Sequence, residues 1–114
     1  MKARAALLLC LLLSACAQTS YLYYGDSSHA YYKAVKHATP QSVADYKACL
    51  ENVFSESARR QQPVPPGLYC DYAMLLVSQK DYASARDYLL REKSCWPESA
   101  LLVDYLLQRY ELEP

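Results

Sequence analysis

Cysteine and histidine are the residue types in this chain that could perform chemistry. The 114 residues include five cysteines, Cys10, Cys16, Cys49, Cys70 and Cys95, and two histidines, His29 and His37. No Cys-X-X-Cys pair occurs, so neither a thioredoxin-like redox site nor a zinc ribbon is indicated. On a helix the two histidines would point about 80° apart, which is a poor arrangement for sharing a metal ion. The spacing leaves a Cys–His nucleophile pair open, although no local signature supports it.

Cys16 follows an apolar segment of the kind that directs export. Lys2 and Arg4 precede an unbroken apolar run over 5–13, which as a helix would span about 14 Å, or about half a bilayer core. Such a run suits a signal peptide better than a transmembrane helix. The segment Leu13-Ser14-Ala15-Cys16 resembles the bacterial lipobox, in which small residues admit the signal peptidase and the cysteine thiol takes up diacylglycerol. We therefore expect Cys16 to be lipidated. The alternative is an ordinary secretory signal followed by a chance cysteine.

The residues after Cys16 indicate a compartment. Ala17 and Gln18 follow it, and the lack of Asp there resembles lipoproteins sorted to the outer membrane. Cleavage would leave 99 residues with a net charge of −2, which suggests no polybasic membrane patch and no nucleic-acid partner. We expect a lipoprotein signal peptide over 1–15, a lipidated tether over 16–28 and a helical domain over 29–114. The domain would be lipid-anchored in the cell envelope, on the periplasmic side of the outer membrane.

The three thiols of the expected domain could form at most one internal disulfide in an oxidising envelope. The helices predicted below place Cys70 near the start of one helix and Cys95 near the end of its antiparallel neighbour. A Cys70–Cys95 disulfide is therefore our hypothesis, provided that the Cα atoms lie within about 7 Å of each other. The alternative is that Cys49, Cys70 and Cys95 are all small buried apolar side chains.

Apolar residues recur at steps of three and four along most of the expected domain, which is typical of amphipathic helices. Thr39 can cap a helix that has Pro40 in its first position, and Asp81 can cap another. Prolines interrupt the pattern over 63–66 and at Pro97. We predict an all-α fold, a short antiparallel helical stack with capping helices. Its helices cover 28–37, 40–60, 68–78, 82–93 and 98–110, the last carrying Leu101, Leu102, Tyr105, Leu106 and Arg109.

Residues 67–99 resemble one tetratricopeptide repeat, a helical hairpin of about 34 residues. In that pattern small residues let two antiparallel helices approach, and large residues pack on either side. Lys80 replaces the usual turn glycine and Glu92 replaces a usual small residue, so the repeat is degenerate and a generic helical hairpin is the alternative. The neighbouring helices should act as caps, because one repeat cannot bury its face alone. The expected packing positions are Tyr69, Tyr72, Ala73, Tyr82, Ala85, Leu89 and Pro97.

Three segments resemble an uncharacterised family of small bacterial lipoproteins, which is known only as a domain of unknown function. They are Pro65-Pro66-Gly67-Leu68-Tyr69, Lys80-Asp81-Tyr82-Ala83-Ser84-Ala85 and Trp96-Pro97-Glu98-Ser99. The resemblance covers most of the chain after Cys16. It implies an envelope lipoprotein that is often encoded beside a curli-pore-like lipoprotein, and it brings no catalytic residue with it.

Tyrosine is unusually frequent, with 12 residues. Tyr23, Tyr24, Tyr31 and Tyr32 lie close together near the start of the expected domain. Tyrosine combines a large apolar body with a hydrogen-bonding tip, which suits protein interfaces. These four residues are therefore candidate partner-binding positions, and the alternative is that their rings only cover the ends of a small helical stack.

These features predict a protein-binding adaptor that is not an enzyme and needs no cofactor or metal. The expected partner is another envelope lipoprotein or a component of secretion or surface-structure assembly, and no small-molecule substrate is indicated. One alternative is an envelope thiol-dependent enzyme or redox factor that uses a free cysteine. Another is a structural lipoprotein without a dedicated partner.

Overall fold

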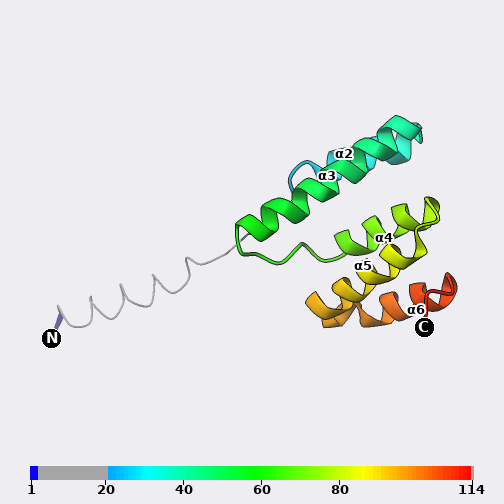
Figure 1. Ribbon diagram of the computed structural model, residues 1–114. Coiled ribbons are helices and arrows are strands. Elements are labelled where there is room, and N and C mark those ends of the chain that lie inside the picture. The colour runs from blue at the N-terminus through cyan, green and yellow to red at the C-terminus, as the bar shows by residue number, and fades with distance from the viewer. Residues whose placement is uncertain (3–20, 114) are drawn as a thin grey trace.

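The described part of the chain is built from helices alone. The structure is a computed structural model that describes residues 1–2 and 21–113. Within 21–113 it contains no strand, and the predicted all-α fold is confirmed. Its elements are α2 (Ser27–His37), α3 (Pro40–Arg59), α4 (Leu68–Ser78), α5 (Tyr82–Cys95), the 3₁₀-helix η1 (Pro97–Ser99) and α6 (Ala100–Arg109). As Figure 1 shows, α2 lies against α3, and α5 lies between α4 and α6.

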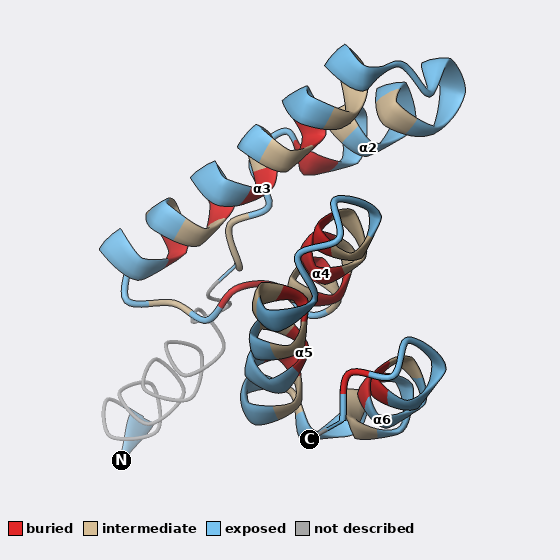
Figure 2. Ribbon diagram, turned by 45° about the vertical axis from the view of Figure 1, so that its right-hand side comes forward, coloured by how far each residue is buried: buried red, intermediate tan, exposed pale blue. Residues whose placement is uncertain are grey.

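The first hairpin pairs α2 with the longer α3. The Thr39 hydroxyl accepts a hydrogen bond from the Ser42 backbone N–H, and the Ser42 hydroxyl accepts one from the Thr39 N–H, each at 3.1 Å. This reciprocal cap, with Pro40 in the first helical position, satisfies free N–H groups and fixes the start of α3. Figure 2 shows the buried positions following one side of α3. They are Tyr46, Leu50, Val53 and Ser57, all of which follow the predicted steps of three and four.

The second hairpin pairs α4 with α5, and small residues lie in its core. Ala73 of α4 and Ala85 of α5 are both completely buried, as is Leu89. The Asp81 carboxylate accepts a hydrogen bond from the Ser84 N–H at 3.2 Å, so the predicted cap of α5 is formed. Leu89 and the two alanines therefore occupy core positions, as the repeat pattern predicts.

Two of the predicted packing positions lie on the surface instead. Tyr82, the first residue of α5, is 49% exposed. Pro97 is exposed and begins η1, where its missing N–H leaves no unpaired donor. The repeat pattern is thus met in the middle of the hairpin and not at its ends.

A cluster of aromatic rings joins the two hairpins. Phe54 of α3 lies between 4.9 and 5.8 Å, centre to centre, from the rings of Tyr69, Tyr72 and Tyr88. The Tyr72 hydroxyl also donates a hydrogen bond to the Glu51 carboxylate at 2.7 Å. Aromatic rings from three helices thus pack against one another, and this packing holds α3 against α4 and α5.

The last helix packs only in part through the residues that its apolar pattern suggested, because Leu106 packs against the core as expected but Leu101, Leu102 and Tyr105 do not. Val103 and Leu107 are buried, whereas Leu101 is 86% exposed and Leu102 and Tyr105 are also exposed. Pro97–Ser99 forms η1 directly before α6. The outer face of α6 therefore carries exposed apolar side chains beside the charged residues Asp104 and Arg109.

The folded domain begins before residue 29. Tyr23 packs against the core, Ser27 is buried, and α2 begins at Ser27. The predicted tether over 16–28 is therefore too long, because tyrosine and serine side chains in this segment pack on α3 and α4. Residues 3–20, which include Cys16 and most of the predicted signal peptide, lie outside the described part of the chain.

Candidate functional site

A groove between α2 and α4 is an apolar surface that includes predicted site residues. Two adjoining hollows of about 220 and 210 Å³ share Tyr31, Tyr46 and Asp71 as lining residues. We call them together the tyrosine groove. Its remaining lining residues are Tyr24, Ser27, Ser28 and Leu68 in the first hollow, and Ala34, Val35, Met74 and Leu75 in the second.

The floor of the tyrosine groove is held by a partly buried hydrogen bond. Tyr46 of α3 is almost fully buried, and its hydroxyl donates to the Asp71 carboxylate of α4 at 2.7 Å. Burial, and next the hydrogen bond to Asp71, raise the pKa of Tyr46 well above its usual range, so its hydroxyl stays protonated. The Tyr31 ring meets the Tyr46 ring edge to face, with the centres 5.6 Å apart. The groove is thus pre-formed, with a carboxylate at its base.

The rim of the tyrosine groove carries exposed apolar and aromatic side chains. Tyr31 is 51% exposed and Val35, one turn further along α2, is 62% exposed. Tyr24 is also exposed and lies in the segment that leads into α2. Exposed large apolar side chains that lie together are a common feature of interaction surfaces, so this rim is a candidate contact surface.

The four tyrosines named from the sequence have three different positions. Tyr24 and Tyr31 line the tyrosine groove. Tyr32 is exposed outside the two hollows, where the Lys36 ammonium lies 5.4 Å from its ring centre. Tyr23 packs inward and donates a hydrogen bond to Asn52. Sequence reasoning missed Val35, Tyr46 and Asp71 as groove residues, because only the packing of α2, α3 and α4 around the two hollows brings them together.

A second cavity places a cysteine and a histidine together. It measures about 180 Å³, and its lining includes His29, Cys49, Asp26, Lys33 and Asp45. Burial is the main cause that raises the pKa of the Cys49 thiol, and the Asp26 backbone only partly opposes it. A catalytic cysteine needs the opposite shift, because the thiolate is the nucleophile. In the described residues no group of three or more His, Cys, Asp or Glu side chains is arranged to hold a metal ion.

The predicted disulfide does not form in this structure. Cys70 and Cys95 are both free thiols, one buried and the other exposed. Cys70 belongs to the core cluster, and burial, followed by the charge of Glu92, raises its pKa to about 12. Cys95 ends α5 with its side chain in solvent. The two side chains therefore occupy different environments although the helices are neighbours.

The buried carboxylate of Glu92 connects three segments of the chain. Its Oε1 accepts a hydrogen bond from the Gly67 backbone N–H at 2.7 Å and one from the Ser99 hydroxyl at 3.1 Å. Its Oε2 is buried and makes no hydrogen bond within the part of the chain that the structure describes. Glu92 thus ties α5 to the loop before α4 and to η1, which explains why a small residue is absent at this repeat position.

The comparisons with known proteins identify a family. A family model described as a domain of unknown function (DUF4810) matches residues 21–106, so the chain belongs to that family. The match begins where the described fold begins, at Tyr21. Searches of curated proteins and of solved structures found no match. In the described residues, no helix is both long and apolar enough to cross a bilayer.

Proposed function

We propose that this member of the DUF4810 family is a lipid-anchored adaptor of the bacterial cell envelope. It binds a protein partner and carries out no catalysis itself. The observation that carries the proposal is the tyrosine groove, a pre-formed apolar hollow whose rim exposes Tyr24, Tyr31 and Val35. The lipid anchor rests on the sequence around Cys16, which resembles a lipobox.

The chemistry of the groove indicates what the partner presents. Tyrosine rings and Val35 favour an apolar segment, such as one face of an amphipathic helix lying in the groove. Asp71 at the base places a negative charge near that segment, so a Lys or Arg beside the apolar face would add specificity. The partner class is another envelope lipoprotein or a component of secretion or surface-structure assembly on the periplasmic side of the outer membrane.

Site-specific photo-crosslinking in intact cells tests this proposal. A photoreactive residue at position 31, on the groove rim, should capture a discrete protein, whereas the same residue at position 83, an exposed site on α5, should not. Val35→Asp should reduce the capture at position 31, because it places a charge on the apolar rim. Identical products from both positions, or capture that is unaffected by Val35→Asp, would rule out the groove as the binding surface.

The thiol-dependent alternative has one observation in its favour, the shared cavity of His29 and Cys49. The raised pKa of Cys49 argues against it, since a protonated thiol is a poor nucleophile. Serine replacement of Cys49, Cys70 and Cys95 separates the two functions. An adaptor still binds its partner and keeps its cellular role after these replacements. A thiol enzyme loses its cellular role, even if it still binds the partner.

A further inference from the structure

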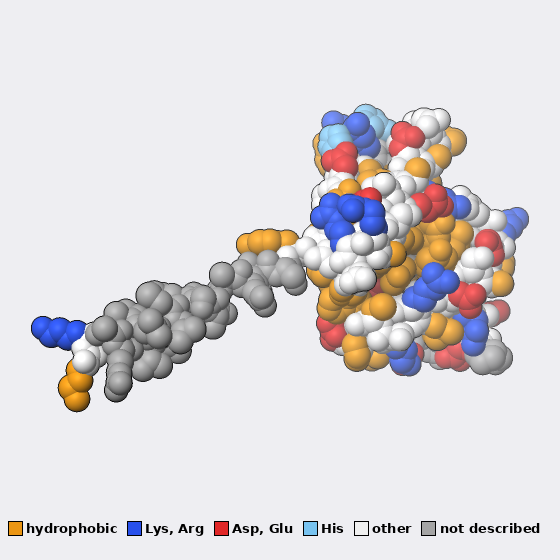
Figure 3. Space-filling view, turned by 60° about the vertical axis from the view of Figure 1, so that its left-hand side comes forward, with side chains coloured by type: hydrophobic (Ala, Val, Ile, Leu, Met, Phe, Trp, Pro, Cys, Tyr) orange, Lys and Arg blue, Asp and Glu red, His pale blue; other side chains and the backbone are white. Residues whose placement is uncertain are grey.

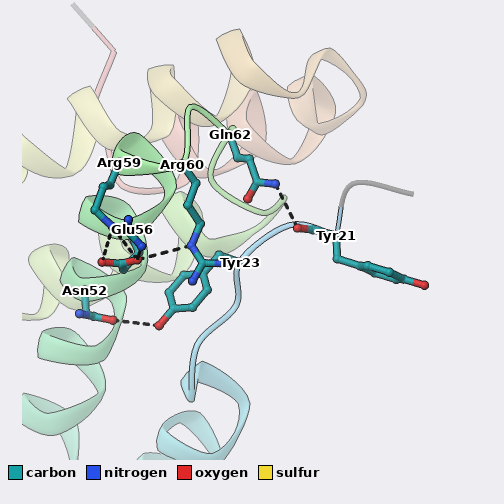
Figure 4. Close-up of polar contacts among 7 residues, drawn as sticks. All are labelled: Tyr21, Tyr23, Asn52, Glu56, Arg59, Arg60 and Gln62. Atoms are coloured by element: carbon teal, nitrogen blue, oxygen red, sulfur yellow. Dashed lines mark hydrogen bonds and ion pairs between the residues drawn. The ribbon is translucent and has the colours of Figure 1, made fainter. Parts of the chain in front are cut away.

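The start of the folded domain is fixed to the C-terminal end of α3. The Tyr23 hydroxyl donates a hydrogen bond to the Asn52 side chain at 3.3 Å, and the Arg60 guanidinium lies 4.3 Å from the centre of the Tyr23 ring. The Gln62 side-chain amide donates to the Tyr21 carbonyl at 3.2 Å. Figure 4 shows these contacts together on one side of the helix end. The point at which the chain leaves the domain toward Cys16 is therefore held in place.

The same end of α3 presents cationic and aromatic groups to solvent. The Tyr21 side chain is 82% exposed, and in Figure 4 its ring points away from the other labelled residues. The Arg59 side chain is 68% exposed and the Arg60 side chain 43% exposed. Figure 3 shows Lys and Arg side chains gathered beside the place where the chain reaches the folded domain. We call Tyr21, Arg59 and Arg60 the entry patch.

The entry patch remains positive after its own ion pairs are counted. Glu56 contacts both arginines, at 2.8 Å from Arg59 and 3.4 Å from Arg60. Hydrogen bonding from Arg59 is the main cause that lowers the pKa of Glu56, so this carboxylate is charged at neutral pH. One carboxylate against two guanidiniums leaves one unit of positive charge. The net charge of −2 expected for the whole chain after cleavage conceals this local surplus.

The chain between Cys16 and the entry patch is short. Four residues, 17–20, separate Cys16 from Tyr21, and a fully extended chain over that interval reaches about 17 Å. An α-helix as long as α3, which has 20 residues, spans about 30 Å. A lipid on Cys16 would thus hold the C-terminal end of α3 close to the bilayer surface, while the opposite end of the hairpin can lie well away from it.

We propose that the entry patch rests on the phospholipid headgroups of the membrane that holds Cys16. Arginine matches phosphate oxygens with paired hydrogen bonds, and tyrosine favours the boundary between apolar and aqueous phases. The headgroup contact, together with the fixed entry point, gives the domain one orientation on the membrane. This inference rests on the lipid anchor of the proposed function.

The test uses the purified full-length lipidated protein in vesicles that contain anionic phospholipid and brominated acyl chains. Tyr21→Trp adds a fluorescent reporter at the patch, and the native Trp96 of the parent protein serves as the internal reference. The expected result is bromolipid quenching of the Tyr21→Trp protein that exceeds quenching of the parent at least twofold. Arg59→Glu, added to the reporter variant, should remove most of that excess. Lys36→Glu, at the far end of the hairpin, is the matched control and should leave it unchanged.

The outcomes separate the patch from the anchor. Protein that does not float with vesicles lacks the anchor, and the lipoprotein assignment then fails. Protein that floats while the reporter variant is quenched no more than the parent overturns the patch proposal and leaves the anchor intact. Equal losses from Arg59→Glu and Lys36→Glu would also overturn it, because charge at any position would then matter equally.

Discussion

Replacing Ala85 with leucine tests the close approach of the second hairpin. Ala85 is completely buried in α5, the helix that packs against both α4 and α6. Leucine adds three carbon atoms at a site with no exposed surface, and overpacking of this kind costs about 1–3 kcal/mol. For a domain of this size each kcal/mol lowers the melting temperature by about 4–8 °C. We therefore expect Ala85→Leu to melt about 5–20 °C below the parent protein.

Ala83→Leu is the matched control, because Ala83 lies on the exposed side of the same helix. Alanine and leucine have similar helix propensities, so this change should alter the free energy of unfolding by no more than about 0.5 kcal/mol. Thermal and urea unfolding followed by far-UV circular dichroism measure both variants. Equal stability of the two variants would refute the reasoning, since it would mean that the hairpin has room at Ala85.

Three further predictions concern other buried groups. Glu92→Ala should lower the free energy of unfolding by about 2–4 kcal/mol in urea titrations, because it removes the acceptor of the partly buried Gly67 N–H and leaves a cavity at a completely buried site. A loss below about 0.5 kcal/mol would contradict the tie between α5 and the loop before α4. Iodoacetamide at pH 8 should modify the exposed Cys95 of the folded protein, but Cys70 only after unfolding. Cys70 is buried and its pKa is raised to about 12, so its thiol stays protonated and covered in the folded protein. Peptide mapping that finds a Cys70–Cys95 disulfide instead would disprove this assignment. Tyr23→Ala should speed amide hydrogen exchange at Ser27 and Ala30, whose N–H groups donate to the Tyr24 and Asp26 carbonyls, at least tenfold while the α4–α5 hairpin exchanges as before. Unchanged exchange at these two amides would show that Tyr23 does not hold this segment.

The parts of the fold that depend on neighbouring residues could be predicted from the sequence. Thr39 and Asp81 cap helices where their side chains predict caps, since capping needs only the next three residues. Tyr46, Leu50 and Val53 are buried because they lie on the apolar stripe of α3. The apolar positions of α6 did not predict which of its faces is buried. Large apolar residues occur on both of its faces, Val103 and Leu107 on the buried one and Leu101 and Tyr105 on the exposed one, so periodicity could not decide which face packs.

The tyrosine groove could be predicted only in part. Tyr24 and Tyr31 were found because tyrosine is frequent near the start of the domain. Asp71 gave no signal, since a single carboxylate in the first turn of a helix is usually explained by the helix dipole. Its role appears only when Tyr46 of another helix donates to it across 25 positions of sequence. Contacts over such separations have no local signature, whereas composition can show which residue types are in excess.

The partner of each tyrosine hydroxyl decides what that tyrosine can do. The hydroxyls of Tyr46 and Tyr72 donate to carboxylates of neighbouring helices, so these rings are committed to the core. Tyr23 donates to Asn52 and its ring lies against Arg60, which commits it to the entry of the chain. An excess of tyrosine therefore does not by itself indicate an interface. The case for partner binding depends on the rings that remain exposed over the groove, and it can be tested there without disturbing the tyrosines that hold the fold.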